Sequence, residues 1–306
     1  MNSLVSICCV SYNHARFIEQ AVRSFWEQDY KNIEILALDD GSSDNSLEVL
    51  NNLKEISPCP MEVYGQPNSG SIPKNYNFLM KKARGKYIAL IALDDMFLKN
   101  AIAHKIEIME NDENVQFVIN TKMMNTNFEK NESTESILNI DKLENITAQD
   151  ILDEDFYHIH SYTVQGSVYR KSLLEAVGYF DEDMIADDIV LRTKTARYVQ
   201  EHPKYKIGVE RYPAVNYRRH DSNVSCNIAL QLRSVAMFYQ RYYPNKRRMR
   251  ALKNGYRSLL KQHKFKEAWS LYKEFSLYRD FTLLIPIWLL CVGFKDIFSS
   301  LKNNKK

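Results

Sequence analysis

Cysteine is scarce in this chain, and its placement does not suit metal binding or cross-linking. The 306 residues include five cysteines, and no two of them form a CxxC pair. Cys8 and Cys9 are adjacent within an apolar run. Neither a disulfide framework nor a structural zinc site is therefore expected. This usage fits a protein kept in the reducing cytosol.

Long hydrophobic runs are also missing. No charged leader precedes the apolar run 4–10, which is too short for a signal peptide, so we expect no export. The most apolar segment, 281–294, has fourteen residues and includes Pro286, whereas a membrane-spanning helix needs about 20. We expect this segment to lie on a bilayer surface, the alternative being a helix packed on the catalytic domain.

Net charge is low, at +3, but it is unevenly distributed. The segment 241–266 holds ten Lys or Arg residues and no Asp or Glu. Such a block is either an ordinary solvated helix face or a surface for lipid headgroups, a polyprenyl diphosphate or nucleic acid. Because no nucleic-acid recognition motif accompanies it, we expect no nucleic-acid partner. With segment 281–294, the block predicts peripheral binding to the anionic inner face of the cell membrane.

Short apolar runs alternate with helical patterns over about the first 95 residues. This alternation predicts an α/β fold in which helices cover a mostly parallel sheet. In such sheets the ligand binds beyond the carboxyl ends of the strands. Strands are expected at 4–10, 33–38, 61–64 and 87–93, and helices at 17–25, 47–53 and 72–82.

The pattern is less regular further along the chain. A fifth strand is expected at 115–120, and the stretch 123–145, rich in Asn and Glu, is interpreted as a mobile loop or an acceptor-side insertion. Order resumes at 164–169, followed by helices at 171–177 and after residue 187. Beyond Ser225 the sequence predicts helix almost throughout.

Three Asp-Asp pairs stand at strand or helix ends: Asp39-Asp40, Asp94-Asp95 and Asp187-Asp188. Adjacent carboxylates repel each other unless a cation, a donor group or water offsets the repulsion. One or two carboxylates plus phosphate oxygens are the usual ligands of Mg²⁺ at a phosphate site. Taken alone, each pair is more often a turn or a helix cap than a functional site.

The surroundings and order of these pairs resemble those of a known family. The chain has Ser11-Tyr-Asn13, then Asp39-Asp-Gly-Ser-Ser-Asp44, then Ala92-Leu-Asp-Asp95. Over about residues 3–225 it resembles the inverting family 2 glycosyltransferases with the Rossmann-like GT-A fold, of the bacterial surface-polysaccharide type that makes O-antigen or capsule. The resemblance implies a catalytic domain at 1–225, with a nucleotide-binding half (1–121) and an acceptor-binding half (122–225). Residues 226–306 would form a helical, basic and apolar C-terminal region.

The resemblance also implies roles for individual residues at the donor site. Asp40 would accept a hydrogen bond from the donor base, and Asp94 would meet the ribose or a metal. Asp95 would bind Mn²⁺ or Mg²⁺ at the diphosphate. The family's commonest motif is Asp-x-Asp-Asp, but the first position here is Ala92, so the choice of metal ligand between Asp94 and Asp95 stays open. The other residues implied at the nucleotide sugar are Ser11, Tyr12, Asn13, Asn68, Gly70, Lys74 and Asn75.

Two later motifs complete the resemblance. Asp187-Asp188, which follows Gly178-Tyr-Phe-Asp-Glu182, is similar to the family's acidic motif, and this makes Asp188 the candidate general base. Tyr217-Arg-Arg-His220 is similar to the segment that closes the site near the diphosphate, where Arg and His220 would stabilise the leaving group.

The sequence therefore predicts an inverting hexosyl- or N-acetylhexosaminyltransferase. It would move sugar from a nucleotide-diphosphate donor, most simply a UDP-sugar, to a growing glycan on a polyprenyl diphosphate. A nucleotidyltransferase is the second reading, although no Gly-rich phosphate loop follows the first strand. A catalytically inactive scaffold is the third, and Ala92 favours it. The sugar, the linkage and the oligomeric state are not readable from the sequence.

Overall fold

The computed structural model describes residues 3–130, 132–185, 187–221, 223, 227–244, 259, 261–262, 264–265 and 267. It divides into two compact units, 1–221 and 222–306. The first unit contains the sheet and all of the expected site residues, and it is described first.

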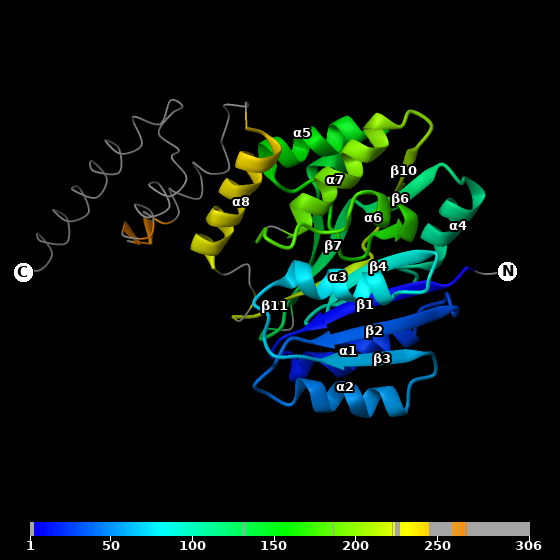
Figure 1. The fold of residues 1–306 in the computed structure, drawn as a ribbon, viewed down its shortest axis with the longest axis vertical. Helices are drawn as coiled ribbons and strands as arrows, with labels where there is room; N and C mark the ends of the chain where they lie inside the picture. The colour runs from blue at the N-terminus through cyan, green and yellow to red at the C-terminus, as the bar shows by residue number, and fades with distance from the viewer. Residues whose placement is uncertain are drawn as a thin grey trace, which may run out of the picture. The chain divides into compact units, whose positions relative to one another are not determined.

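Within the described residues, seven strands form the main sheet in the order β10-β6-β9-β4-β1-β2-β3. All neighbouring pairs are parallel except those that β9 makes with β4 and β6. The expected mostly parallel α/β fold is therefore confirmed (Figure 1). The strands are β1 (Val5–Ser11), β2 (Ile33–Asp39), β3 (Met61–Gly65), β4 (Tyr87–Ala92), β6 (Val115–Asn120), β9 (Val168–Arg170) and β10 (Lys206–Glu210).

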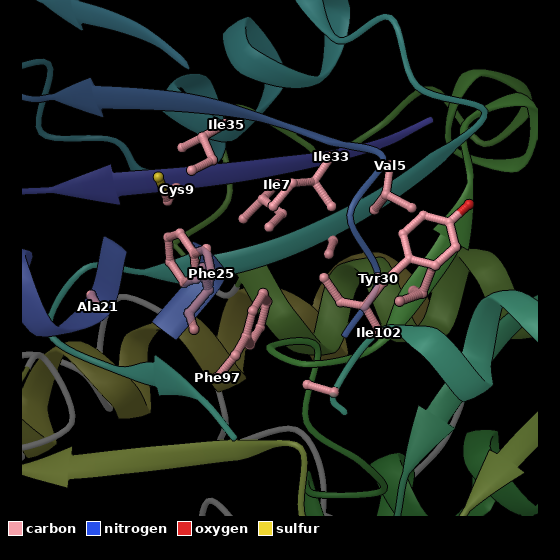
Figure 2. Close-up of a cluster of buried hydrophobic side chains, with 14 of the residues drawn as sticks. Val5, Ile7, Cys9, Ala21, Phe25, Tyr30, Ile33, Ile35, Phe97 and Ile102 are labelled. Carbon is pink, nitrogen blue, oxygen red and sulfur yellow. The ribbon is translucent and has the colours of Figure 1, made fainter. Parts of the chain in front are cut away.

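Helices cover both faces of this sheet because consecutive strand residues point to opposite sides. In β1, Cys9 packs into one hydrophobic layer and Cys8 into the other. Figure 2 shows Ile7 and Cys9 gathered with Phe25 and Phe97 in the first layer. This layer is covered by α1 (Ala15–Trp26), α2 (Ser46–Glu55) and α4 (Ala103–Asn111). The other is covered by α3 (Ile72–Lys82), α5 (Ala148–His158), α6 (Lys171–Ala176) and α7 (Asp187–Glu201).

A second sheet includes part of the stretch 123–145, which was interpreted as a mobile loop or an acceptor-side insertion, and the interpretation as a mobile loop was wrong. In this sheet β7 (Lys122–Asn127) and β8 (Glu132–Ile137) pair as an antiparallel hairpin, and a 3-10 turn, η1 (Asn139–Lys142), follows. β7 also pairs with β11 (Val215–Arg219), which in turn pairs with β5 (Met96–Phe97). The sequence of the hairpin shows no alternation of apolar and polar residues because β8 is almost entirely exposed. Its order comes from pairing with a strand far along the chain.

In the second unit, the structure describes the helix α8 (Ile228–Tyr242), which fits the helical expectation beyond Ser225. Most of the basic block 241–266 and the whole apolar segment 281–294 lie outside the described residues. In the described part of the chain, no helix is long and apolar enough to cross a bilayer.

Candidate active site

Three loops at one edge of the main sheet carry most of the expected site residues. Strand β1 ends at Ser11, opposite Asp39 of β2, and Val10 is opposite Ala92 of β4. The three strands therefore end at the same level. β1 lies between β2 and β4, where the chain connections change direction, and open sheets bind ligands at such a point.

Asp39 and Asn13 fix the shape of the turn after β2. Asp39 accepts hydrogen bonds from the backbone N of Ser42 at 3.0 Å and from its Oγ at 2.5 Å. Asn13 has a left-handed backbone (φ 57°), and its Oδ1 accepts a hydrogen bond from the N of Ser43 at 2.8 Å. Both side chains therefore contact protein, and they support the neighbouring Asp40.

Asp40 is buried and accepts hydrogen bonds from the loop after β3. Its donors are Nε2 of Gln66 at 2.7 Å, the N of Ser69 at 2.8 Å and the Oγ of Ser69 at 3.0 Å. Burial alone would raise the pKa of Asp40, but bonds from Gln66, Ser69 and Asn75 outweigh it and hold the pKa below its usual value. Asp40 is thus a carboxylate at neutral pH, a form that can only accept hydrogen bonds.

Gly41 allows the two loops to approach each other. Its φ is +72°, and a Cβ at this position would lie 2.4 Å from the backbone N of Asn68. Only glycine fits both conditions. Asn68 itself shapes the second loop, because its Oδ1 accepts a hydrogen bond from the N of Gly70 at 2.7 Å.

The remaining candidate residues for the nucleotide site differ in their exposure to solvent. The side chain of Tyr12 is 48% exposed, and Lys74 in the first turn of α3 is also exposed. Ser11 is buried, and its Oγ has no hydrogen-bond partner among the described residues. Of these three, Tyr12 and Lys74 are the ones that a ligand can reach without displacing protein atoms.

Two histidines flank Asp94. Nε2 of His220 lies 3.3 Å and Nε2 of His14 lies 3.7 Å from Oδ2 of Asp94. His220 is buried and stacks on Phe17, with ring centroids 4.5 Å apart. Burial alone would raise the pKa of Asp94, but these histidines hold it below its usual value. The structure thus places His220 beside Asp94 and adds His14, which is not among the residues that the sequence analysis assigned to the site.

Asp95 is fully buried, and its electrostatic setting differs from that of its neighbour. Its Oδ1 accepts a hydrogen bond from the backbone N of Arg218 at 2.8 Å. Burial, and then the charge of Asp94, raise the pKa of Asp95 well above its usual value. Oδ2 of Asp95 is buried and makes no hydrogen bond of normal geometry among the described residues, although the side chain of Gln165 is near enough to oppose the rise in the pKa of Asp95.

The guanidinium of Arg218 supports the loop that carries both carboxylates. Its Nε donates to the backbone oxygen of Asp94, and its Nη2 lies 3.2 Å from the backbone oxygens of Asp95 and Phe17. Its Nη1 donates to Oε1 of Gln20 at 2.9 Å. These donors are occupied by protein groups, so Arg218 acts on the site by holding this loop.

Asp94 and Asp95 fit a divalent cation that takes further ligands from a phosphate. Among the described residues, no three Asp, Glu, His or Cys side chains are arranged to hold a metal by themselves. The unsatisfied Oδ2 of Asp95 and the adjacent charge of Asp94 are what an added cation would compensate. Mg²⁺ typically binds one or two carboxylates and completes its shell with phosphate oxygens and water.

Asp188 lies in the first turn of α7, partly buried. Burial, and secondarily the charge of Asp155, raise its pKa above the usual value, and Arg192 partly opposes them. The turn that leads to α7 is tied to α3, since Asn77 exchanges two hydrogen bonds of 3.0 Å with the backbone of Phe180. A carboxyl group of raised pKa is a stronger proton acceptor once ionised.

A known protein family matches the N-terminal part of the chain. Residues 6–178, more than half of the chain, match the family described as Glycosyl transferase family 2. The chain belongs to this family. This glycosyltransferase is 35% identical over 108 residues to the UDP-Glc:alpha-D-GlcNAc-diphosphoundecaprenol beta-1,3-glucosyltransferase WfaP of Escherichia coli, which covers 35% of this chain and 41% of WfaP. It is 26% identical over 195 residues to the minor teichoic acid biosynthesis protein GgaA of Bacillus subtilis, 59% of this chain and 40% of GgaA. It thus spans well under half the length of these curated relatives.

Solved structures support the GT-A fold of this glycosyltransferase. Staphylococcus aureus TarS in complex with UDP-GlcNAc superposes with a TM-score of 0.60 at 18% identity, over 91% of this chain and 75% of that chain. The Pyrobaculum calidifontis mannosyltransferase PcManGT, in complex with GDP-Man and Mn²⁺, gives a TM-score of 0.54 at 12% identity, over 96% and 87% of the two chains. At these identities the likeness concerns the fold alone.

Proposed function

We propose that this family 2 glycosyltransferase transfers a hexose or N-acetylhexosamine from a UDP-sugar, with inversion, to a hydroxyl of a lipid-linked surface glycan. The observation that carries this proposal is the placement of Asp40 and the Asp94-Asp95 pair beside β1, at the edge where the sheet topology changes direction. Asp40 is an ionised acceptor suited to the imide N–H of uracil. Thymine and guanine nucleotides also offer such a donor and are the alternatives.

The proposed reaction is a single displacement at C1 of the donor sugar. The acceptor oxygen bonds to C1 as the bond from C1 to the diphosphate oxygen breaks, and the diphosphate leaves with the electron pair. Asp188 takes the proton of the acceptor hydroxyl. A divalent cation held by Asp94 and Asp95 would supply positive charge to the departing diphosphate.

The acceptor and the cellular location extend this proposal. The names of WfaP and GgaA connect those relatives with a diphosphoundecaprenol-linked sugar and with teichoic acid. We expect a related lipid-linked acceptor here and peripheral binding to the inner membrane face through segments 241–266 and 281–294. If a chain ending at residue 280 pellets with anionic vesicles as fully as the complete chain does, residues 281–306 are not the anchor.

A thermal-shift screen tests donor binding. Candidates are UDP, UDP-glucose, UDP-N-acetylglucosamine, dTDP-glucose and GDP-mannose, each with Mn²⁺ or with EDTA, and CDP and ADP serve as controls. A ligand at a hundredfold excess over its Kd stabilises the fold by about 2.7 kcal/mol. We expect UDP compounds to raise Tm with Mn²⁺ and to raise it less with EDTA. No response to any nucleotide would contradict the proposal.

Turnover separates an enzyme from an inactive scaffold, the reading that Ala92 keeps open. The assay measures UDP release from a UDP-sugar that binds, with a synthetic GlcNAc-diphospholipid as acceptor. We expect the substitution Asp188→Asn to lower kcat by about 10²- to 10⁴-fold, the usual contribution of general-base assistance, with little change in donor affinity. Full activity of this variant would remove Asp188 as the base.

A further inference from the structure

Arg192 and Asp155 form a buried ion pair beside the proposed base. Nε of Arg192 lies 2.9 Å from Oδ2 and 3.1 Å from Oδ1 of Asp155, and the two side chains are 3% and 0% exposed. The rest of the guanidinium donates to the backbone oxygens of Tyr162 at 3.1 Å and Ile159 at 3.0 Å. The pair thus connects α7 to α5 and to the segment that follows α5.

Packing alone does not explain why two charges are buried here. Taking an ion pair out of water costs several kcal/mol per ion, and apolar residues of similar volume often replace such pairs without loss of stability. The surroundings of α5 and α7 already supply an apolar interface through Ile151, Leu152 and Leu191. The hydrogen bonds of the pair to the backbone of Ile159, Ser161 and Tyr162 fix this segment, and the charge of Arg192 is available for a second role.

The position of Arg192 points to that role. It follows Asp188 by four residues on one helix, and side chains at this spacing are neighbours on the same helix face. Burial raises the pKa of Asp188, and the nearby charge of Arg192 opposes this by lowering it. Asp155 acts on Asp188 in the opposite direction, because it places a like charge nearby.

We propose that Arg192 is a positioning residue for Asp188, and that Asp155 holds Arg192 so that its charge is shared between the two carboxylates. This inference rests on the proposed role of Asp188 as the base. A guanidinium bound by Asp188 alone would keep that carboxylate ionised but make it a poor proton acceptor. Sharing the guanidinium with Asp155 keeps Asp188 ionised and leaves it basic enough to take the acceptor proton.

The titratable groups around Asp188 allow a test by the pH profile. Besides Arg192 and Asp155, the groups on neighbouring elements are the buried Tyr169 and Tyr162, which share a hydrogen bond of 3.2 Å, and His160 near the ion pair. Both tyrosines have pKa values raised by burial, so they stay neutral in the acidic range. When kcat/KM is plotted against pH, the fall on the acidic side, here called the acidic limb, gives the pKa of the base in the free enzyme.

The experiment compares this limb in the full-length wild type and four variants, with the UDP-sugar that the wild type turns over, UDP-glucose or UDP-N-acetylglucosamine. Arg192→Gln removes the opposite charge and is expected to move the limb up by about one pH unit. Asp155→Asn removes the like charge and is expected to move it down by a similar amount. Arg192→Lys keeps the charge and should leave the limb closer to that of the wild type than Arg192→Gln does.

Arg170→Gln is the matched control for loss of a buried arginine. Arg170 is buried and donates to the backbone oxygens of Val115 at 2.7 Å and Met109 at 2.6 Å. It pairs with Tyr87 at the opposite end of β4 from Asp94. This variant should lower Tm and leave the limb in place, which distinguishes a general loss of stability from a change at Asp188.

Opposite shifts in Arg192→Gln and Asp155→Asn support the inference. If the acidic limb stays at the wild-type pH in both variants while Asp188→Asn is inactive, the inference is overturned. The proposed role of Asp188 as the base then still stands. Full activity of Asp188→Asn instead removes the base itself, and the inference with it. If Arg192→Gln does not fold, the near-isosteric Asp155→Asn decides alone: a downward shift supports the inference and an unchanged limb overturns it.

Discussion

Replacing Asp95 by asparagine should stabilise the metal-free protein while removing its response to the nucleotide with metal. Asp95 is fully buried beside a second carboxylate, and its pKa in the folded chain lies well above the usual value. The folded state therefore binds a proton more tightly than the unfolded state does. Between about pH 4 and the raised pKa, this group lowers the free energy of unfolding as pH rises. Asp95→Asn should remove that part of the pH dependence.

The size of the effect follows from the linkage between protonation and folding. Each pH unit between the usual pKa and the raised pKa of Asp95 is worth about 1.4 kcal/mol. Asparagine keeps an acceptor for the N of Arg218, and the weaker neutral hydrogen bond costs about 1 kcal/mol. We therefore expect a net gain of at least about 1 kcal/mol at pH 7, or about 2 to 4 °C in Tm for a domain of this size.

The assay is thermal unfolding between pH 5 and pH 8 in EDTA, repeated with Mn²⁺ and UDP. We expect Asp95→Asn to melt higher than the wild type in EDTA, by a margin that grows with pH, and to lose most of the stabilisation by UDP that depends on Mn²⁺. A variant that melts lower than the wild type in EDTA at pH 7, or that keeps the full Mn²⁺-dependent response, would refute this reasoning.

Three further substitutions test other parts of the account. Gly41→Ala forces a Cβ against Asn68 and should cost about 1 to 3 kcal/mol of stability, measured by urea unfolding, and weaken UDP binding; an unchanged unfolding midpoint would contradict the close approach of the loops. Asp40→Asn should raise the Kd for UDP by about tenfold to a hundredfold in calorimetric titration, and it should also lower Tm because asparagine cannot accept every hydrogen bond that Gln66 and Ser69 donate; an equal Kd would exclude Asp40 from base recognition. Glu210→Gln leaves the buried Lys105, 2.7 Å from Glu210, without its counter-charge and should cost about 3 to 5 kcal/mol in urea unfolding; a loss below about 1 kcal/mol would show that the lysine is compensated otherwise.

The main sheet could be predicted from sequence because each of its early strands and helices carries its own signal. The apolar run 4–10 corresponds to β1, and the helical pattern after it corresponds to α1. The predicted and observed boundaries of these two elements differ by one or two residues. The hairpin of β7 and β8 could not be predicted in this way. Its partner β11 follows much later in the chain, and its outer strand has little to bury.

In the candidate site, too, some features could be predicted from sequence and others could not. Asp40 and the Asp94-Asp95 pair could be placed from sequence because parallel strands bring their carboxyl ends to one edge. The proximity of His14 to Asp94 could not, since it depends on the packing of two separate loops. The backbone contacts of Arg218 could not be predicted from sequence either. They show that a residue next to His220 can hold the loop of Asp94 and Asp95 without contacting a ligand.

The anomeric configuration of the product, determined by proton NMR, tests whether this glycosyltransferase inverts the donor sugar with Asp188 as the base. The wild type is incubated with Mn²⁺, an α-linked UDP-sugar selected by the thermal-shift screen and a GlcNAc-diphospholipid acceptor, beside Asp188→Asn. We expect a β-linked product from the wild type and at most about a hundredth of that rate from Asp188→Asn, which should bind the donor equally well. An α-linked product, or equal rates for the two proteins, would contradict this expectation.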